Sequence, residues 1–152
     1  MKSGPSDRIQ KHVLLSATRS RVWRALTDAA EFGQWFRVKL ENRFVPGQST
    51  SGYITYPGYE HLRFVVLVER MDAEHYFSFR WHPYAIDPKA DYSEEPTTLV
   101  EFRLEPVSQG TRLTVIESGF DQLPPGRRDE AFRMNEGGWT VQTENIRKHV
   151  DN

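Results

Sequence analysis

The amino-acid sequence predicts an α+β fold in which a curved antiparallel β-sheet wraps around a long C-terminal α-helix. Three observations predict this fold. Six short β-prone stretches lie between residues 37 and 119, and each is bounded by turn-forming residues. Several of them alternate apolar and polar side chains, which gives a sheet one dry and one wet face. The helical segment 127–150 is the only large element left to cover the dry face.

The first third of the chain predicts a strand followed by two short helices. Residues 1–8 are expected to form a flexible tail, and the apolar, β-prone run 9–16 predicts the first strand. Ser16 or Thr18 can cap a helix whose inward stripe consists of Val22, Trp23 and Leu26. A second short helix is expected over 29–35. Residues 9–152 are therefore expected to form a single domain, because 152 residues are too few for two.

The middle of the chain predicts six strands, at 37–45, 51–56, 62–71, 75–82, 98–106 and 111–119. Alternation is clearest in the last three, where the dry face carries Phe77, Phe79, Trp81, Val100, Phe102, Leu104, Leu113 and Val115. Pro46-Gly47 and Pro57-Gly58 are among the breaks between the strands. Strands this short, joined in series, predict hairpins.

The C-terminal segment follows the break Pro124-Pro125-Gly126 and predicts a helix over 127–150. One side of it repeats every three or four residues and comprises Phe132, Asn135, Trp139, Gln142, Ile146 and Val150. Gly137 and Gly138 lie in its middle, where each glycine costs about 1 kcal/mol relative to alanine. We expect either a close approach of the sheet or a bend of the helix at this point.

Composition argues against several classes of partner. The formal net charge of −1 leaves no basic excess for nucleic acid. The chain has no cysteine, and its five histidines show no metal-ligand spacing, so no metal is expected. No Gly-x-Gly-x-x-Gly or Walker motif is present, and no cofactor is expected. No run of 18 apolar residues or apolar leader occurs, which predicts a cytoplasmic protein without a membrane partner.

Several local motifs, taken in order, resemble one known superfamily. They are Ala17, Val22-Trp23-Arg24-Ala25-Leu26-Thr27-Asp28, Gln34-Trp35-Phe36, Phe79-Arg80-Trp81, the run 97–102, the run 111–120, and Gly138-Trp139. The chain resembles the SRPBCC or START-like superfamily, and more closely the family named after the activator of the ninety-kilodalton heat-shock protein's ATPase. The resemblance spans about residues 9–150. It implies a helix-grip fold with a cavity between the sheet and the C-terminal helix that accepts apolar or amphipathic small molecules.

The expected wall of that cavity is mainly aromatic. Its predicted residues are Trp35, Tyr53, Phe64, Phe77, Phe79, Trp81, Phe102, Val115, Glu117, Phe132, Asn135 and Trp139. The alternative is that these rings form a close-packed core. The loop 83–96 is acidic and rich in proline but contains two tyrosines and an isoleucine, which favours a lid over a solvated connection.

Glu117 continues the dry-face alternation of its strand, so its carboxylate is expected to point into the cavity with a raised pKa. It is the candidate for a general acid or base. Two alternatives remain open. A β-bulge near Gly119 would turn the side chain toward solvent, or Arg80 or Asn135 would pair with it in a structural role.

Three functions are compatible with these features, and binding is favoured over catalysis. The first is binding of a small hydrophobic or amphipathic molecule between sheet and helix, which the resemblance extends to a stress-response role. The second is a cyclase- or hydratase-like enzyme that uses Glu117 as acid or base. The third is a co-chaperone-like module with a chaperone or another protein as its partner.

Overall fold

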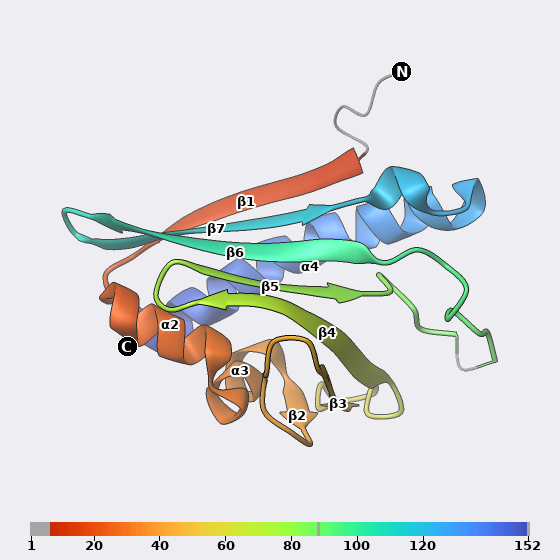
Figure 1. Cartoon of the computed structure of the whole chain (residues 1–152), viewed down its shortest axis with the longest axis horizontal. Coiled ribbons are helices and arrows are strands. Elements are labelled where there is room, and N and C mark those ends of the chain that lie inside the picture. Colours follow the sequence, from red (N-terminus) through yellow and green to blue (C-terminus); the bar gives the residue numbers. More distant parts are fainter. Residues whose placement is uncertain (1–6, 88, 152) are drawn as a thin grey trace.

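The computed structural model describes residues 7–87 and 89–151, and these form one seven-stranded sheet with a long helix on one face (Figure 1). The elements in chain order are β1 (Arg8–Leu15), α2 (Arg19–Thr27), α3 (Ala29–Phe36), β2 (Val38–Leu40), β3 (Ser49–Ile54), β4 (Arg63–Asp72), β5 (Tyr76–Trp81), β6 (Thr98–Val107), β7 (Gly110–Ser118), the 3₁₀ helix η1 (Phe120–Gln122) and α4 (Pro125–Asp151). All neighbouring strands are antiparallel, in the order β1-β7-β6-β5-β4-β3-β2. The predicted α+β helix-grip architecture is confirmed.

Most boundaries differ from the predicted ones by one or two residues, and three of the differences have structural interest. β1 begins at Arg8, the last residue of the segment expected to be a tail, and residues 1–6 lie outside the described residues. α4 begins at Pro125, not at 127, because proline is well tolerated in the first turn of a helix. The predicted strand 37–45 is shortened to Val38–Leu40.

The side chain of Asn42 explains the short strand at this sheet edge. Its Nδ2 donates to the Ser49 carbonyl at 2.9 Å, and its Oδ1 accepts from the Ser51 amide at 3.3 Å. The carboxamide thus makes the two bonds that a strand backbone would make. The Asn42 side chain thus satisfies backbone groups of β3 without extending β2. A shorter β2 leaves fewer open backbone groups at this sheet edge for pairing with another chain.

The centre of the sheet is packed solidly against α4. Phe77, Phe79 and Phe102 are almost completely buried, and their ring centres lie 5.7–5.8 Å apart. Trp139 of α4 meets Phe102 edge to face at 5.8 Å. At this density the rings leave no room for a ligand directly beneath the centre of the sheet.

The glycine pair in α4 does not mark a close approach. A Cβ added to Gly137 or Gly138 would meet nothing within 4 Å beyond the helix's own turns. The expectation that the sheet approaches the helix here is therefore wrong, because the glycines lie on the exposed side of α4.

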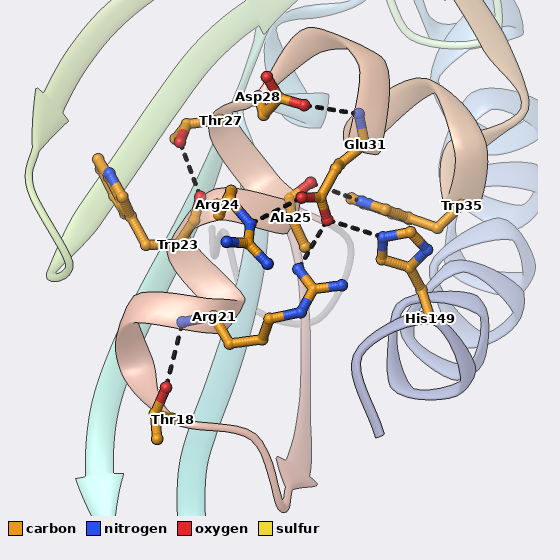
Figure 2. A network of polar contacts seen from close by, with 10 residues as sticks. All are labelled: Thr18, Arg21, Trp23, Arg24, Ala25, Thr27, Asp28, Glu31, Trp35 and His149. Atoms are coloured by element: carbon orange, nitrogen blue, oxygen red, sulfur yellow. Dashed lines mark hydrogen bonds and ion pairs between the residues drawn. The ribbon is translucent and has the colours of Figure 1, made fainter. Parts of the chain in front are cut away.

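The C-terminal end of α4 is tied to α2 and α3 by a charged network (Figure 2). The Glu31 carboxylate accepts from Arg21 at 2.6 Å and from Arg24 at 2.8 Å, and it lies 2.9 Å from Nε2 of His149. Burial opposes ionisation of Glu31, but the bonds from His149, Arg21 and Arg24 outweigh it and lower its pKa to about 2. This network fixes one end of α4 against the two short helices.

Side-chain caps at the N-termini of α2 and α3 lie beside the same network. Thr18 accepts from the Arg21 amide and Asp28 from the Glu31 amide, so each short helix begins at a side-chain cap (Figure 2). The prediction that Ser16 or Thr18 caps the first helix is resolved in favour of Thr18. Asp151, at the end of α4, accepts from the Ser16 amide at 3.1 Å and so joins α4 to the end of β1.

Candidate functional site

The sheet opens at one end, between β4 and β5. Their ladder stops at the pair Leu67 and Arg80, although β4 extends back to Arg63. β5 ends at Trp81, and Pro83 soon follows, which has no N–H to continue a ladder. Figure 1 shows β4 curving away from β5 toward this end. The two strands therefore separate there.

A cleft occupies the open end and has two connected lobes. An inner lobe of about 370 Å³ lies against β4 and the 83–96 loop, and an outer lobe of about 460 Å³ extends along α4. Both lobes share the lining residues Phe36, Ile54, Leu62, Trp81, Tyr84, Ile86 and Asn135. Volumes of this size are typical of small-molecule sites. We refer to these two lobes together as the cleft.

The 83–96 loop forms one wall of the cleft through Tyr84, Ile86 and Tyr92. Arg127, in the first turn of α4, holds this loop. Its guanidinium donates to the carbonyls of Pro83 at 2.7 Å and Tyr84 at 3.0 Å, and it pairs with Glu95 at 3.1 Å. It also lies 4.8 Å from the centre of the Tyr92 ring. One side chain thus joins both ends of the loop to the helix.

Glu117 lies beneath the floor of the cleft and is completely buried. Its carboxylate accepts hydrogen bonds from Nε1 of Trp81 at 2.7 Å, Oγ1 of Thr98 at 2.6 Å and Nε1 of Trp139 at 2.8 Å. Nδ2 of Asn135 contacts both oxygens, at 3.0 and 3.1 Å. These donors come from β5, β6 and α4, so Glu117 connects three elements around β7.

Among the described residues, every hydrogen-bond donor to Glu117 is neutral. Burial raises the pKa of this carboxyl, and the hydrogen bonds from Thr98, Trp81, Trp139 and Asn135 oppose that shift. The two indole N–H groups can only donate, so they favour the ionised form. The Thr98 hydroxyl can also accept a hydrogen bond, and it therefore offers a partner to the protonated form of Glu117.

This arrangement favours a structural role for Glu117. Both oxygens already hold donors, and the side chain lines neither lobe of the cleft. The carboxylate instead orients the groups that do line it, since Trp81, Asn135 and Trp139 face the cleft beyond their contact with Glu117. Trp81 and Trp139 stack with ring centres 6.0 Å apart.

The alternatives for Glu117 can now be decided. The bulge near Gly119 is absent at this position, because Glu117 stays in register with Ile9 of β1 and Val100 of β6. Arg80 is not its partner and pairs with Glu69 at 2.6 Å. The pairing with Asn135 is present.

The predicted wall residues separate into three groups. Four line the cleft, namely Phe64, Trp81, Asn135 and Trp139, and Glu117 supports it from below. Five belong to the packed core instead, because their rings or methyl groups fill the space under the sheet: Trp35, Phe77, Phe79, Phe102 and Val115. Trp35 also donates its indole N–H to the Ala25 carbonyl at 2.8 Å.

The remaining two predicted residues lie elsewhere. Tyr53 is 44% exposed on the outer face of the sheet, where Arg63 packs over its ring at 4.7 Å. Phe132 meets Phe120 edge to face at 5.2 Å and borders a separate hollow beside β1. Neither contributes to the cleft, because strand alternation turns Tyr53 outward and Phe132 lies nearer the start of α4.

Several residues that line the cleft were not predicted from the sequence, chiefly Phe36, Arg37, Ile54 and Leu62. They flank element ends, where periodicity gives no signal. A signal did exist for Tyr84, Ile86 and Tyr92, since apolar residues in an acidic loop need a surface to cover. Within residues 7–87 and 89–151, no three His, Cys, Asp or Glu side chains gather in a way that could hold a metal ion.

Comparison with known proteins decides the family. Residues 16–151 match the model of the activator of Hsp90 ATPase homolog 1-like proteins. The chain belongs to this family. A search of the curated proteins found no match. No helix in the part of the chain that the structure describes has the length and hydropathy of a membrane span.

Several solved structures share the fold of this member of the family. A protein from Arthrobacter aurescens is 20% identical, with a TM-score of 0.78 over 99% of this chain and 89% of that one. Protein MLL2253 from Mesorhizobium loti is 22% identical, with a TM-score of 0.75 over 95% and 96%. The Aha1 dimer from Colwellia psychrerythraea is 14% identical, with a TM-score of 0.71 over 95% and 96%. At these identities the likeness shows the fold alone.

Proposed function

We propose that this domain binds a small apolar or amphipathic molecule in the cleft at the open end of its sheet. The observation that carries the proposal is the aromatic cleft itself, whose two lobes measure about 370 and 460 Å³ and have a mainly apolar lining. Phe36, Trp81 and Tyr84 give it flat, rigid walls that lose little conformational entropy when a ligand binds.

The floor of the cleft supports this proposal. A binding site needs lining side chains that stay in place when the ligand leaves. Trp81, Asn135 and Trp139 are each held from below by Glu117. The hydrogen bonds of the floor therefore do not depend on a ligand, and the apolar faces of the two indoles remain available.

Adjacent glycines on α4 provide a direct test. Gly138 lines the outer lobe and Gly137 does not, while both positions are exposed and free of neighbours. We expect Gly138→Trp to place an indole in the outer lobe of the cleft. This should weaken binding of the neutral fluorescent probe N-phenyl-1-naphthylamine at least about tenfold, which corresponds to about 1.4 kcal/mol. Gly137→Trp, the matched control, should leave its affinity unchanged.

The measurement is a fluorescence titration of the wild type and both variants, with thermal unfolding to confirm that all three are folded. Absence of probe binding to the wild type would overturn the proposal. Equal binding by the two variants would place the binding site outside the cleft and would overturn it as well.

A second candidate function is supported by the outer face of the sheet. Tyr53, Val65 and Leu67 are 44%, 51% and 43% exposed on the neighbouring strands β3 and β4. Exposed apolar side chains that adjoin one another are typical of protein-interaction surfaces. A protein partner, with a chaperone ATPase of the Hsp90 type as the first to test, would dock there.

This second candidate can be separated from the first. Tyr53 and Leu67 lie outside the cleft lining, so Tyr53→Thr with Leu67→Thr leaves the cleft unchanged. A protein-interaction role predicts that the wild type alters the steady-state ATPase rate of the purified chaperone and that the double variant does not. An unchanged rate with the wild type would exclude this partner.

A further inference from the structure

The lining of the cleft includes basic side chains but no acidic ones among the described residues. The chain has 21 acidic residues, yet no Asp or Glu is among the described residues that line either lobe. The polar lining consists of Arg37, Arg63, His82, carboxamides of α4 and the hydroxyl groups of several tyrosines. A low-dielectric cleft with cations and without anions at its edge attracts a negative group.

Two of the three basic side chains are already engaged. Arg63 lies 3.6 Å from Glu41 and packs over Tyr53 on the outer face. Nε2 of His82 is 3.1 Å from the Glu95 carbonyl. Neither offers a free positive charge to a ligand.

Arg37 differs from both. It is exposed at the rim of the outer lobe, and its guanidinium carbon lies 5.7 Å from the centre of the Tyr56 ring. Within the described part of the chain its guanidinium forms no hydrogen bond and no ion pair with an acidic side chain. Its planar group can bind a carboxylate or sulfonate through two N–H donors.

The backbone of Arg37 is held in a conformation that costs energy. It is left-handed, with φ 71° and ψ 58°, at the C-terminus of α3. Its amide donates to the Gly33 carbonyl at 3.0 Å, and its carbonyl accepts from the Thr55 amide at 2.9 Å. Since a non-glycine residue stays left-handed only where its surroundings impose it, these bonds fix the position from which the guanidinium extends.

The carboxamides that follow on α4 do not compete for the same role. Nε2 of Gln142 donates to the Phe36 carbonyl at 3.2 Å, and Nδ2 of Asn145 donates to Oε1 of Gln142 at 3.1 Å. The hydrogen bond from Gln142 satisfies the carbonyl of Phe36, the last residue of α3. Arg37 is therefore the charged donor that the rim leaves open.

We propose that the ligand of the cleft is an amphipathic anion, with a flat apolar body between the aromatic walls and one acidic group on Arg37. This inference rests on the proposed binding function and specifies its ligand class. The acidic group stays at the exposed rim, where its desolvation costs little, while the body fills the lobes.

Two probes with the same ring system test the charge. N-phenyl-1-naphthylamine is neutral, and 1-anilinonaphthalene-8-sulfonate adds one sulfonate to it. We expect the sulfonate probe to bind the wild type more tightly than the neutral one. Arg37→Gln should weaken sulfonate binding by about three- to tenfold, as for a partly exposed charge-assisted contact, and leave neutral binding unchanged.

Matched variants separate this contact from a general effect of charge. Arg43→Gln removes a guanidinium that is exposed and outside the cleft lining, and it should leave both affinities unchanged. Arg37→Lys keeps the charge and should retain most of the sulfonate preference. Thermal unfolding of each variant reports whether it is folded.

The outcomes distinguish the two proposals. Equal affinity for the two probes, or sulfonate binding that Arg37→Gln does not weaken, overturns the anion inference and leaves the binding function standing. Failure of both probes to bind the wild type overturns both.

Discussion

Two glutamates hold α4 in place, and their surroundings are opposite. Glu31 lies near the C-terminal end of the helix, partly exposed, among Arg21, Arg24 and His149. Glu117 lies beneath the helix's middle, wholly buried, and none of its partners carries a charge. The pKa of Glu31 falls to about 2, whereas burial raises that of Glu117.

The difference shows what each kind of contact can do. Cations stabilise the ionised form of Glu31 strongly enough to outweigh its burial, at a site that water still reaches. Neutral donors only reduce the cost of burying Glu117, but they keep the surrounding space apolar. A cation under the cleft would add a strongly hydrated charge next to its floor. Neutral indoles can bind the carboxylate and still present hydrophobic ring faces to a ligand.

The largest expected effect is the loss of the buried carboxylate. Glu117→Leu leaves two indole N–H groups and a carboxamide without an acceptor, so we expect the free energy of unfolding to fall by about 3–5 kcal/mol. Glu117→Gln keeps one carbonyl oxygen and should cost less, about 1–3 kcal/mol. Urea denaturation at pH 7 measures both.

Glu69→Leu is the matched control, since this strand glutamate is exposed and pairs with Arg80 on the wet face. It should change stability by no more than about 1 kcal/mol. If Glu117→Leu were no more destabilising than this control, the buried hydrogen bonds would contribute nothing to holding α4.

The second effect depends on pH and concerns Glu31. Its folded pKa of about 2 lies below the ordinary glutamate value of 4.5, so its stabilisation is complete above pH 4.5 and is lost as the pH falls toward 2. Glu31→Gln should therefore lower stability at pH 7 by about 1–2 kcal/mol, after allowance for partial exposure, and by almost nothing near pH 2.

Glu117 should change the free energy of unfolding with pH in the opposite direction to Glu31. Its pKa is raised in the fold, so the unfolded chain ionises first and stability decreases as the pH rises from 4.5 toward the folded pKa. Unfolding free energies of the wild type and of Glu31→Gln and Glu117→Gln, measured from pH 3 to 7, compare the two slopes. Parallel curves for the two variants would contradict the contrast between the sites.

The smallest expected effect is at the glycine pair of α4, which lies in the same stretch of the helix as the Glu117 contacts Asn135 and Trp139. A Cβ at Gly137 or Gly138 meets open space, so alanine at either position should stabilise the helix by up to about 1 kcal/mol. Because an added Cβ meets no neighbour at either position, the two single variants should agree in thermal stability, although only Gly138 lines the cleft. A destabilising Gly138→Ala would show that the glycine is needed for a bend or a contact that the static fold does not contain.

Much of the fold could be read from local pattern. The alternation of Phe77, Phe79 and Trp81 gave the orientation of β5, and the continuation from Leu113 through Val115 placed Glu117 on the buried face. Thr18 was one of two candidate caps, and the structure selected it. These predictions succeeded because side-chain direction in a regular strand or helix depends only on neighbours in sequence.

The candidate site was less accessible to the same reasoning. Strand alternation identifies which rings face inward but cannot tell a filled interior from an open one, so Phe77 and Phe102 were expected in a wall and instead fill the core. The cleft arises where β4 and β5 separate, a feature of pairing between segments distant in sequence.

Local periodicity predicted the order of the elements and the buried face of each strand, and it favoured an inward Glu117 while a bulge near Gly119 stayed open as an alternative. The position of the cleft and the hydrogen bonds that hold Glu117 to Trp81, Thr98, Asn135 and Trp139 became evident in the folded chain alone. The same is true of the Arg37 guanidinium, which contacts the Tyr56 ring but forms no ion pair within residues 7–87 and 89–151. The physical reason is that these properties depend on distances between groups brought together from separate elements. Packing sets those distances, and no single stretch of the chain contains them.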